Sequence, residues 1–139
     1  MDGILNKLVI EKRTSPLIKV VGVGGGGGNT VNYMYNNSDA DISYVVMNTD
    51  SQALISSPVP NKLLLGPDVT EGLGAGANPS TAEEAALSSK DEIYKKFLKI
   101  DPYNENVYYY AISHYMDEGQ EDLARKYYAQ IEKLFAKDL

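Results

Sequence analysis

The sequence contains no cysteine and only one histidine, His114. These absences exclude disulfides, thiolate metal sites and histidine-rich metal centres. No apolar run reaches the 18 residues that suggest a membrane-spanning helix. The first 16 residues mix charged and apolar side chains, unlike a secretory signal, so we expect a cytoplasmic protein. A formal net charge of −6 argues against a nucleic-acid partner.

Five consecutive glycines at 24–28 follow an apolar stretch at 17–23. Glycine loses more conformational freedom on folding than any other residue. A chain therefore uses such a run where the backbone approaches a ligand closely or adopts positive φ. A strand, a glycine turn and a helix in succession direct backbone N–H groups and a helix N-terminus at one point. This pattern predicts a phosphate-binding loop.

The two halves of the chain differ in composition. Ten of the 12 glycines lie between Gly22 and Gly76, and eight of the 11 tyrosines lie between Tyr94 and Tyr128. The first half alternates strand and helix patterns, which predicts an α/β fold with a three-stranded parallel half sheet of Rossmann-like type. The second half predicts helices alone. We expect strands at 17–23, 42–48 and 62–65, a glycine turn at 24–28, a loop at 66–79, and helices at 29–37, 50–56, 80–100, 105–118 and 121–137.

Residues 34 positions apart match in the second half, for example Tyr94 with Tyr128 and Ile100 with Leu134. This period resembles the tetratricopeptide repeat over about residues 88–138, with an ordinary helical hairpin as the alternative. One and a half repeats are too few for that family's peptide groove. We therefore expect the tyrosines to pack between helices, although the adjacent tyrosines at 108–110 cannot all face inward. The matching and packing positions are Tyr108, Ala111, Tyr115, Gly119, Ala124, Tyr127 and Tyr128.

Residues 22–27 formally match the dinucleotide pattern GxGxxG, with Asp50 as its acidic partner, so a Rossmann NAD(P) site is one hypothesis. Two further segments, at 48–54 and 72–79, follow the second and third predicted strands. With residues 22–29 they resemble the first three nucleotide loops of the FtsZ/tubulin family of cell-division GTPases. The resemblance covers about residues 1–93, and it accounts for segments that a Rossmann site leaves unexplained.

The resemblance implies that the first loop lies against nucleotide phosphates, that the second approaches the phosphates and ribose, and that the third closes over the γ-phosphate. GTP or GDP, with or without Mg²⁺, is the implied ligand. No catalytic or metal-binding residue is assigned. The expected nucleotide-binding residues are Gly24, Gly25, Gly26, Gly27, Gly28, Asn29, Thr30, Asn48, Asp50, Gly74, Ala75, Gly76, Ala77 and Asn78.

The family's fourth strand, its second glycine loop, its guanine-contacting residues and its catalytic aspartate loop have no counterpart here. We therefore expect no GTP hydrolysis by this chain alone. We expect domains at 1–87 and 88–139, joined as in a fusion or chimera. The missing strand would bare the edge of strand 17–23, which the C-terminal helices or self-association would cover. The alternative function is a helical protein-interaction module, acting through helices 105–137, with a vestigial glycine loop.

Overall fold

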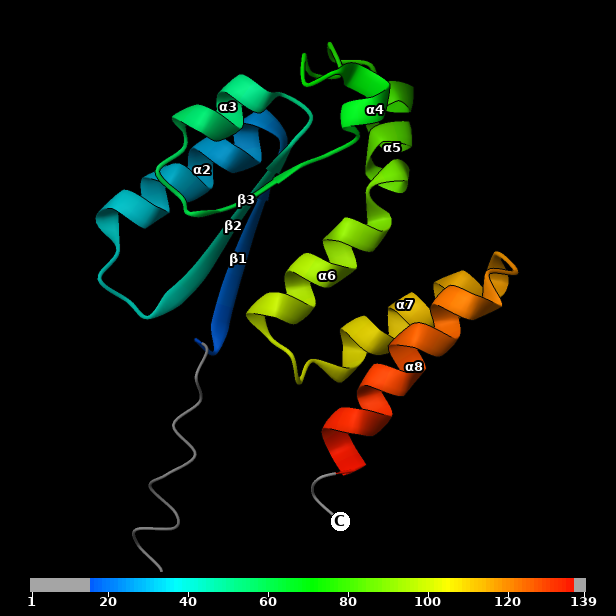
Figure 1. The fold of residues 1–139 in the computed structure, drawn as a ribbon. Helices are drawn as coiled ribbons and strands as arrows, with labels where there is room; N and C mark the ends of the chain where they lie inside the picture. Colours follow the sequence, from blue (N-terminus) through cyan, green and yellow to red (C-terminus); the bar gives the residue numbers. More distant parts are fainter. Residues whose placement is uncertain (1–15, 137–139) are drawn as a thin grey trace, which may run out of the picture.

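The computed structural model describes residues 16–136. Its first part is a parallel sheet in the order β1-β2-β3 flanked by helices, and its last part is a helical hairpin (Figure 1). The three-stranded parallel sheet confirms the predicted α/β architecture. The elements are β1 (Ile18–Val23), α2 (Gly24–Asn37), β2 (Ile42–Asn48), α3 (Ser51–Ser56), β3 (Asn61–Leu64), α4 (Pro67–Thr70), α5 (Pro79–Ser88), α6 (Lys90–Ile100), α7 (Glu105–Asp117) and α8 (Glu121–Phe135).

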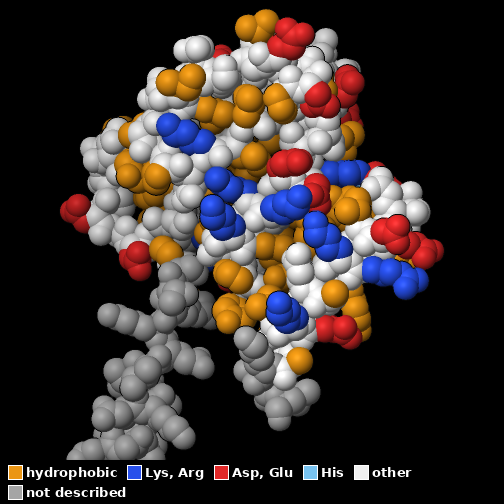
Figure 2. Space-filling view, viewed as in Figure 1, with side chains coloured by type: hydrophobic (Ala, Val, Ile, Leu, Met, Phe, Trp, Pro, Cys, Tyr) orange, Lys and Arg blue, Asp and Glu red, His pale blue; other side chains and the backbone are white. Residues whose placement is uncertain are grey.

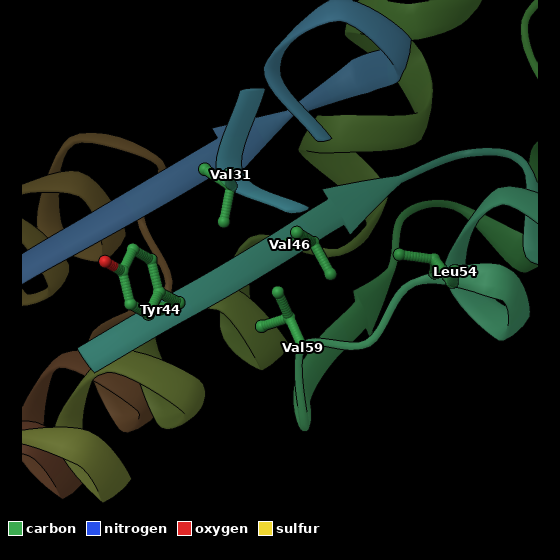
Figure 3. Packing of buried hydrophobic residues seen from close by; sticks show 5 residues of the cluster. All are labelled: Val31, Tyr44, Val46, Leu54 and Val59. Carbon is green, nitrogen blue, oxygen red and sulfur yellow. The ribbon is translucent and has the colours of Figure 1, made fainter. Parts of the chain in front are cut away.

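The central strand β2 is buried on both faces of the sheet. Successive side chains of a strand point to opposite faces, so its apolar residues feed two separate clusters. On one face Val45 and Met47 pack with Leu65 and with α6. On the other face the cluster lies between the sheet, α2 and α3, and Figure 3 shows its members Val31, Tyr44, Val46, Leu54 and Val59. The nearly continuous apolar run at 42–47, interrupted only by Ser43, is therefore explained by cover on both sides.

Helix α6 is apolar on two faces. Ile93, Phe97 and Ile100 pack on the sheet, whereas Tyr94 and Leu98 pack against the hairpin. The expected helix at 80–100 is thus two helices, α5 and α6, broken at Ser89. The buried Ser89 hydroxyl accepts a hydrogen bond from the Gly66 N–H at 2.7 Å, which ties the break to the end of the sheet.

The hairpin of α7 and α8 has a tyrosine-rich core. Tyr108, Tyr115 and Tyr127 are buried, as predicted, and the other two tyrosines of the 108–110 triplet are exposed. Tyr128 was expected to pack between helices, but it is 54% exposed because it follows the inward-facing Tyr127 by one position on α8. The tetratricopeptide assignment and the domain boundary at 87/88 stay predictions.

The glycine run is helical, not a separate turn. Only Gly24 is left-handed, with φ 74°, and α2 begins with it. One such residue is enough to redirect the chain from β1 into the helix. Gly22 then allows a close crossing, since a Cβ built on it would lie 2.5 Å from the Gly27 carbonyl oxygen.

β1 is an edge strand, because β2 is its one neighbour in the described sheet. The C-terminal helices or self-association were expected to cover this edge, and of those helices α7 and α8 bury their apolar faces against α6 instead. They do so because α6 offers a second apolar face, which an amphipathic hairpin can bury against. At the end of α6, Asp101 pairs with Lys19 of β1 at 3.3 Å.

Lysine and arginine side chains gather over the middle of the face shown in Figure 2, between apolar patches. Of the lysines on α6, Lys90 pairs with Glu118 and Lys95 with Asp91. The first pair ties α6 to the end of α7, whereas the second lies within α6 itself, as on a solvated helix face. Among residues 16–136, no helix combines the length and the apolarity needed to span a membrane.

Candidate functional site

The candidate site lies at the carboxyl ends of the parallel strands, where α2 and α3 begin. In open α/β sheets, ligands bind in the crevice outside these ends. β1 runs directly into α2, and β2 ends at Asn48, three residues before α3 begins at Ser51. The sheet order therefore places the first and second predicted loops beside each other.

The N-terminus of α2 is bare. Its N-cap is Val23, and no side chain of the described residues makes a capping hydrogen bond. The first N–H groups of a helix have no partner inside it, so those of the glycine run are available to an anion. A Cβ built on Gly25, Gly26 or Gly28 would meet no described atom within 4 Å. Packing of the chain on itself therefore does not explain these three glycines.

A hollow of about 40 Å³ joins the first and second loops. It has room for a few water molecules but not for a larger ligand. No lysine or arginine lines it, so backbone amides and carboxamides supply its polarity. The lining residues are Gly24, Gly25, Gly28, Asn29, Asn32, Val46, Met47, Asn48, Ala53, Leu54 and Ser57.

The second loop is held by its own side chains. Asp50 caps α3, since its Oδ1 accepts hydrogen bonds from the N–H groups of Gln52 at 2.9 Å and Ala53 at 3.3 Å. The Asn48 Oδ1 in turn accepts from the Asp50 N–H at 3.1 Å. These bonds give both residues a structural role, whatever part they play toward a ligand.

The glycines of the third loop have a conformational reason. Gly72, Gly74 and Gly76 all adopt left-handed φ values between 60° and 87°. Ala77 is left-handed as well, with φ 58°, and Asn78 caps α5 by accepting from the Ser80 and Thr81 N–H groups. This backbone needs glycine even without a ligand. The glycines without such a reason are therefore Gly25, Gly26 and Gly28 of the first loop.

Backbone hydrogen bonds join the second loop to the third. The Ser51 N–H donates to the Gly72 carbonyl at 2.9 Å, and the Gly74 N–H donates to the Thr49 carbonyl at 3.1 Å. Thr70 adds a bond from its hydroxyl to the Thr49 carbonyl at 3.2 Å. These hydrogen bonds therefore hold the second and third loops in a fixed arrangement relative to each other.

The predicted residues thus fall into two groups. The hollow brings Gly24, Gly25, Gly28, Asn29 and Asn48 together, and hydrogen bonds tie Asp50 and its neighbours to the loop of Gly74, Ala75, Gly76, Ala77 and Asn78. The remaining predicted residues, Gly26, Gly27 and Thr30, neither line the hollow nor take part in the hydrogen bonds between the second and third loops. The Thr30 hydroxyl is exposed and bonds to the Gly26 carbonyl in its own helix.

Two polar residues that line the hollow were not predicted from the sequence. Asn32 and Ser57 line the hollow and are joined by a hydrogen bond of 2.6 Å. Asn32 lies one helical turn after Gly28, and this spacing could have predicted that it faces the same side of the helix. Nothing in the sequence pattern marks Ser57 as a residue of the site. Gly22 belongs to the GxGxxG match, but its reason is packing. Within residues 16–136, no three histidine, aspartate or glutamate side chains gather closely enough to hold a metal ion together.

Comparisons with known proteins agree with this arrangement of loops. The model of the Tubulin/FtsZ family, GTPase domain, matches residues 17–110. The chain is 48% identical over 94 residues to the cell division protein FtsZ of Porphyromonas gingivalis, covering 68% of this chain and 21% of that protein. It is 52% identical over 86 residues to the mitochondrial division protein fszB of Dictyostelium discoideum, covering 62% and 24%.

A solved structure of an FtsZ mutant from M. jannaschii superposes with a TM-score of 0.57 at 37% identity, covering 71% of this chain and 29% of that one. The chain spans between a fifth and a quarter of the length of the two curated relatives described above. Both the sequence and the fold of the matched region agree with the order of loops found at the strand ends. The chain therefore belongs to the Tubulin/FtsZ family.

Proposed function

We propose that this chain binds a guanine nucleotide, GTP or GDP, in the manner of an FtsZ-type cell-division protein. The observation that carries the proposal is the bare N-terminus of α2. Its first-turn amides have no side-chain cap, and Gly25, Gly26 and Gly28 leave open space around the backbone. A phosphate oxygen can approach such amides closely, and the positive end of the helix favours its charge.

The other two loops would complete the contact with the phosphates. We assign Asn48 and Asp50 to the phosphate and ribose side and residues 74–78 to the γ-phosphate side. The hydrogen bonds between these loops support a joint role, because a ligand bound at one loop would also affect the conformation of the other. The capping bonds of Asp50 and Asn78 keep each loop in a defined shape.

Mg²⁺ in this site would be held largely by the nucleotide, since Mg²⁺ commonly uses substrate phosphates with only one or two carboxylates. We assign no catalytic residue and expect no hydrolysis by the chain alone. Assembly of division filaments, which the family resemblance implies, stays an expectation, since the matched division proteins are four to five times longer than the matched region. Cytoplasmic location and an origin by fusion remain expectations.

A protein partner for the hairpin is a separate expectation. If one exists, it would meet the exposed rings of Tyr109, Tyr110 and Tyr128 on α7 and α8. Tyr108 and Tyr115 are buried, so substitutions there would report on folding and not on a partner. Self-association of the chain is likewise an expectation.

Equilibrium titration with a fluorescent GDP or GTP analogue tests the nucleotide proposal. Gly26 is exposed and helical, and a Cβ there meets no described atom. Gly26→Ala should therefore raise the free energy of unfolding by about 0.5–1 kcal/mol. The same methyl group would stand where a phosphate approaches, so affinity should fall roughly tenfold, which is about 1.4 kcal/mol.

Asn36→Ala is the matched control, because Asn36 is exposed on the same helix but lies toward its other end. It should stabilise the helix slightly and leave nucleotide affinity unchanged. Unaltered affinity in Gly26→Ala would show that the glycine run does not hold the phosphates. Absence of binding by the folded, unaltered chain would remove the proposal altogether.

A further inference from the structure

The first helical turn of α2, residues 24–28, is the glycine turn, and it has no side chains that could hold it in place. Residues 24–28 are all glycine, and Asn29 and Thr30 are exposed. The first anchored residue of the helix is Val31, which is 2% exposed in the cluster over the sheet. Beyond the close crossing of Gly22 and Gly27, the side chains that fix the direction of the first-turn amides therefore lie farther along the helix.

The next residue, Asn32, supplies a second point of attachment. Its Oδ1 accepts a hydrogen bond of 2.6 Å from the hydroxyl of Ser57, which follows α3. Asn32 lies four residues after Gly28 and therefore on the same side of α2. Both side chains line the hollow beneath the glycine turn.

Ser57 is itself fixed on several sides. It is 6% exposed, and its N–H donates to the Leu54 carbonyl at 3.2 Å. Its hydroxyl also accepts from the Val59 N–H at 3.2 Å, and its carbonyl accepts from the Lys62 Nζ at 2.7 Å. Ser57 is thus held in place between α3 and β3, and its hydroxyl donates the hydrogen bond that reaches α2.

We propose that Asn32 is a positioning residue that, through Ser57, fixes the glycine turn of α2 against the second loop and aims its free amides at the nucleotide phosphates. Val31 and Met34 hold α2 on the sheet, and the hydrogen bond between Asn32 and Ser57 adds a polar attachment toward α3 that sets the direction of the first turn of α2. The inference rests on the proposed function for its ligand, but the geometry of the turn is measurable without one.

Hydrogen exchange in the nucleotide-free chain tests the positioning directly. In an α-helix the N–H groups of residues 29–32 bond to the carbonyls of residues 25–28, so their exchange reports on the glycine turn. Ser57→Ala and Asn32→Ala should each accelerate this exchange about threefold to tenfold, the range expected when one hydrogen bond is lost. Asn32→Asp keeps an oxygen acceptor for the Ser57 hydroxyl and should restore the slow exchange.

Nucleotide affinity, measured where every variant is fully folded, provides the second readout. Ser57→Ala and Asn32→Ala should each weaken binding about threefold to tenfold, and the double variant should lose no more than either single one. The matched control is Ser56→Ala, because the Ser56 hydroxyl is exposed and bonds only to carbonyls of its own helix. That control should change neither exchange nor affinity.

The outcomes separate the two proposals. Unchanged exchange at residues 29–32 in Ser57→Ala and Asn32→Ala would overturn the positioning role, even if the unaltered chain binds nucleotide. Unchanged affinity with faster exchange would overturn it as well, since the turn would then not need its direction to bind. Faster exchange in a chain that binds no nucleotide would support the hold on the glycine turn and refute the proposed function.

Discussion

At the scale of single residues, the side chain of Asp91 has three polar partners on three different helices of the chain. Its Oδ1 accepts from the hydroxyls of Tyr115 at 3.0 Å and Tyr127 at 2.7 Å, and its Oδ2 pairs with Lys95 at 2.6 Å. Burial opposes ionisation of Asp91, but hydrogen bonds from Lys95, Tyr127 and Tyr115 outweigh it and lower the pKa. Burial, followed by the same hydrogen bonds, raises the pKa values of both tyrosines. One carboxylate thus joins α6, α7 and α8.

Asp91→Asn should destabilise the chain by about 1–2 kcal/mol at pH 7, because charged hydrogen bonds become neutral ones. The folded pKa of Asp91 is lowered, so its contribution is complete above the unfolded pKa of about 3.9 and disappears as pH falls through the folded value. Urea unfolding at a series of pH values should therefore show the two proteins converging in acid. A difference that stays constant from pH 7 to pH 2 would contradict this account.

At the scale of elements, the junction of β1 and α2 depends on a close crossing. A Cβ on Gly22 would lie 2.5 Å from the Gly27 carbonyl oxygen and 2.7 Å from the Val31 Cγ2. Val31 is buried in the sheet cluster, so it has little freedom to move aside. Glycine is therefore present for different reasons within this motif. Gly22 allows close packing, Gly24 adopts positive φ, and Gly26 leaves open space beside the backbone.

Gly22→Ala should destabilise the fold by about 1–3 kcal/mol, the usual cost of overpacking a filled site. Thermal or urea unfolding measures the change, and Gly26→Ala is the control because it adds the same methyl group in open space. If both variants have equal stability, the close crossing of strand and helix is not a constraint.

At the scale of the whole molecule, α6 belongs to both halves. Phe97 packs with the sheet and Tyr94 with the hairpin, so a boundary at 87/88 would remove α6 from the face of the sheet. Val45 and Met47, which are 0% and 4% exposed, would then face water. The composition shift that suggests the boundary marks a change of elements, but the apolar core continues across it.

A chain of residues 1–87 should therefore fail to fold alone, whereas residues 1–104, which retain α6, should keep a cooperative unfolding transition. Each fully buried Val or Met side chain is worth about 1.5–3 kcal/mol, and a domain of this size has little to spare. Circular dichroism during urea unfolding compares the two. A cooperative transition in residues 1–87 would support the predicted boundary as that of an independent domain.

Local sequence was sufficient to predict the strands, the order of the three loops and the family, because these depend on short apolar runs and on glycine spacing. The same residues determined that some tyrosines at 108–110 must be exposed, since a helix has only one side facing its partner. The start of α2 at Gly24 was not predicted, because glycine patterns do not distinguish a turn from a helix that packing stabilises.

Only the tertiary structure showed which contacts join distant segments. The bond between Asn32 and Ser57 spans 25 positions and that between Gly66 and Ser89 spans 23, and neither pair leaves a periodic signal. The placement of the hairpin on α6, and not along β1, likewise depended on which apolar faces remained after the sheet was covered. The sequence by itself determined the elements and the glycine loop, because these are local. Tertiary packing decided the direction of the glycine loop and the continuity of the apolar core across α6, because packing depends on the whole chain at once.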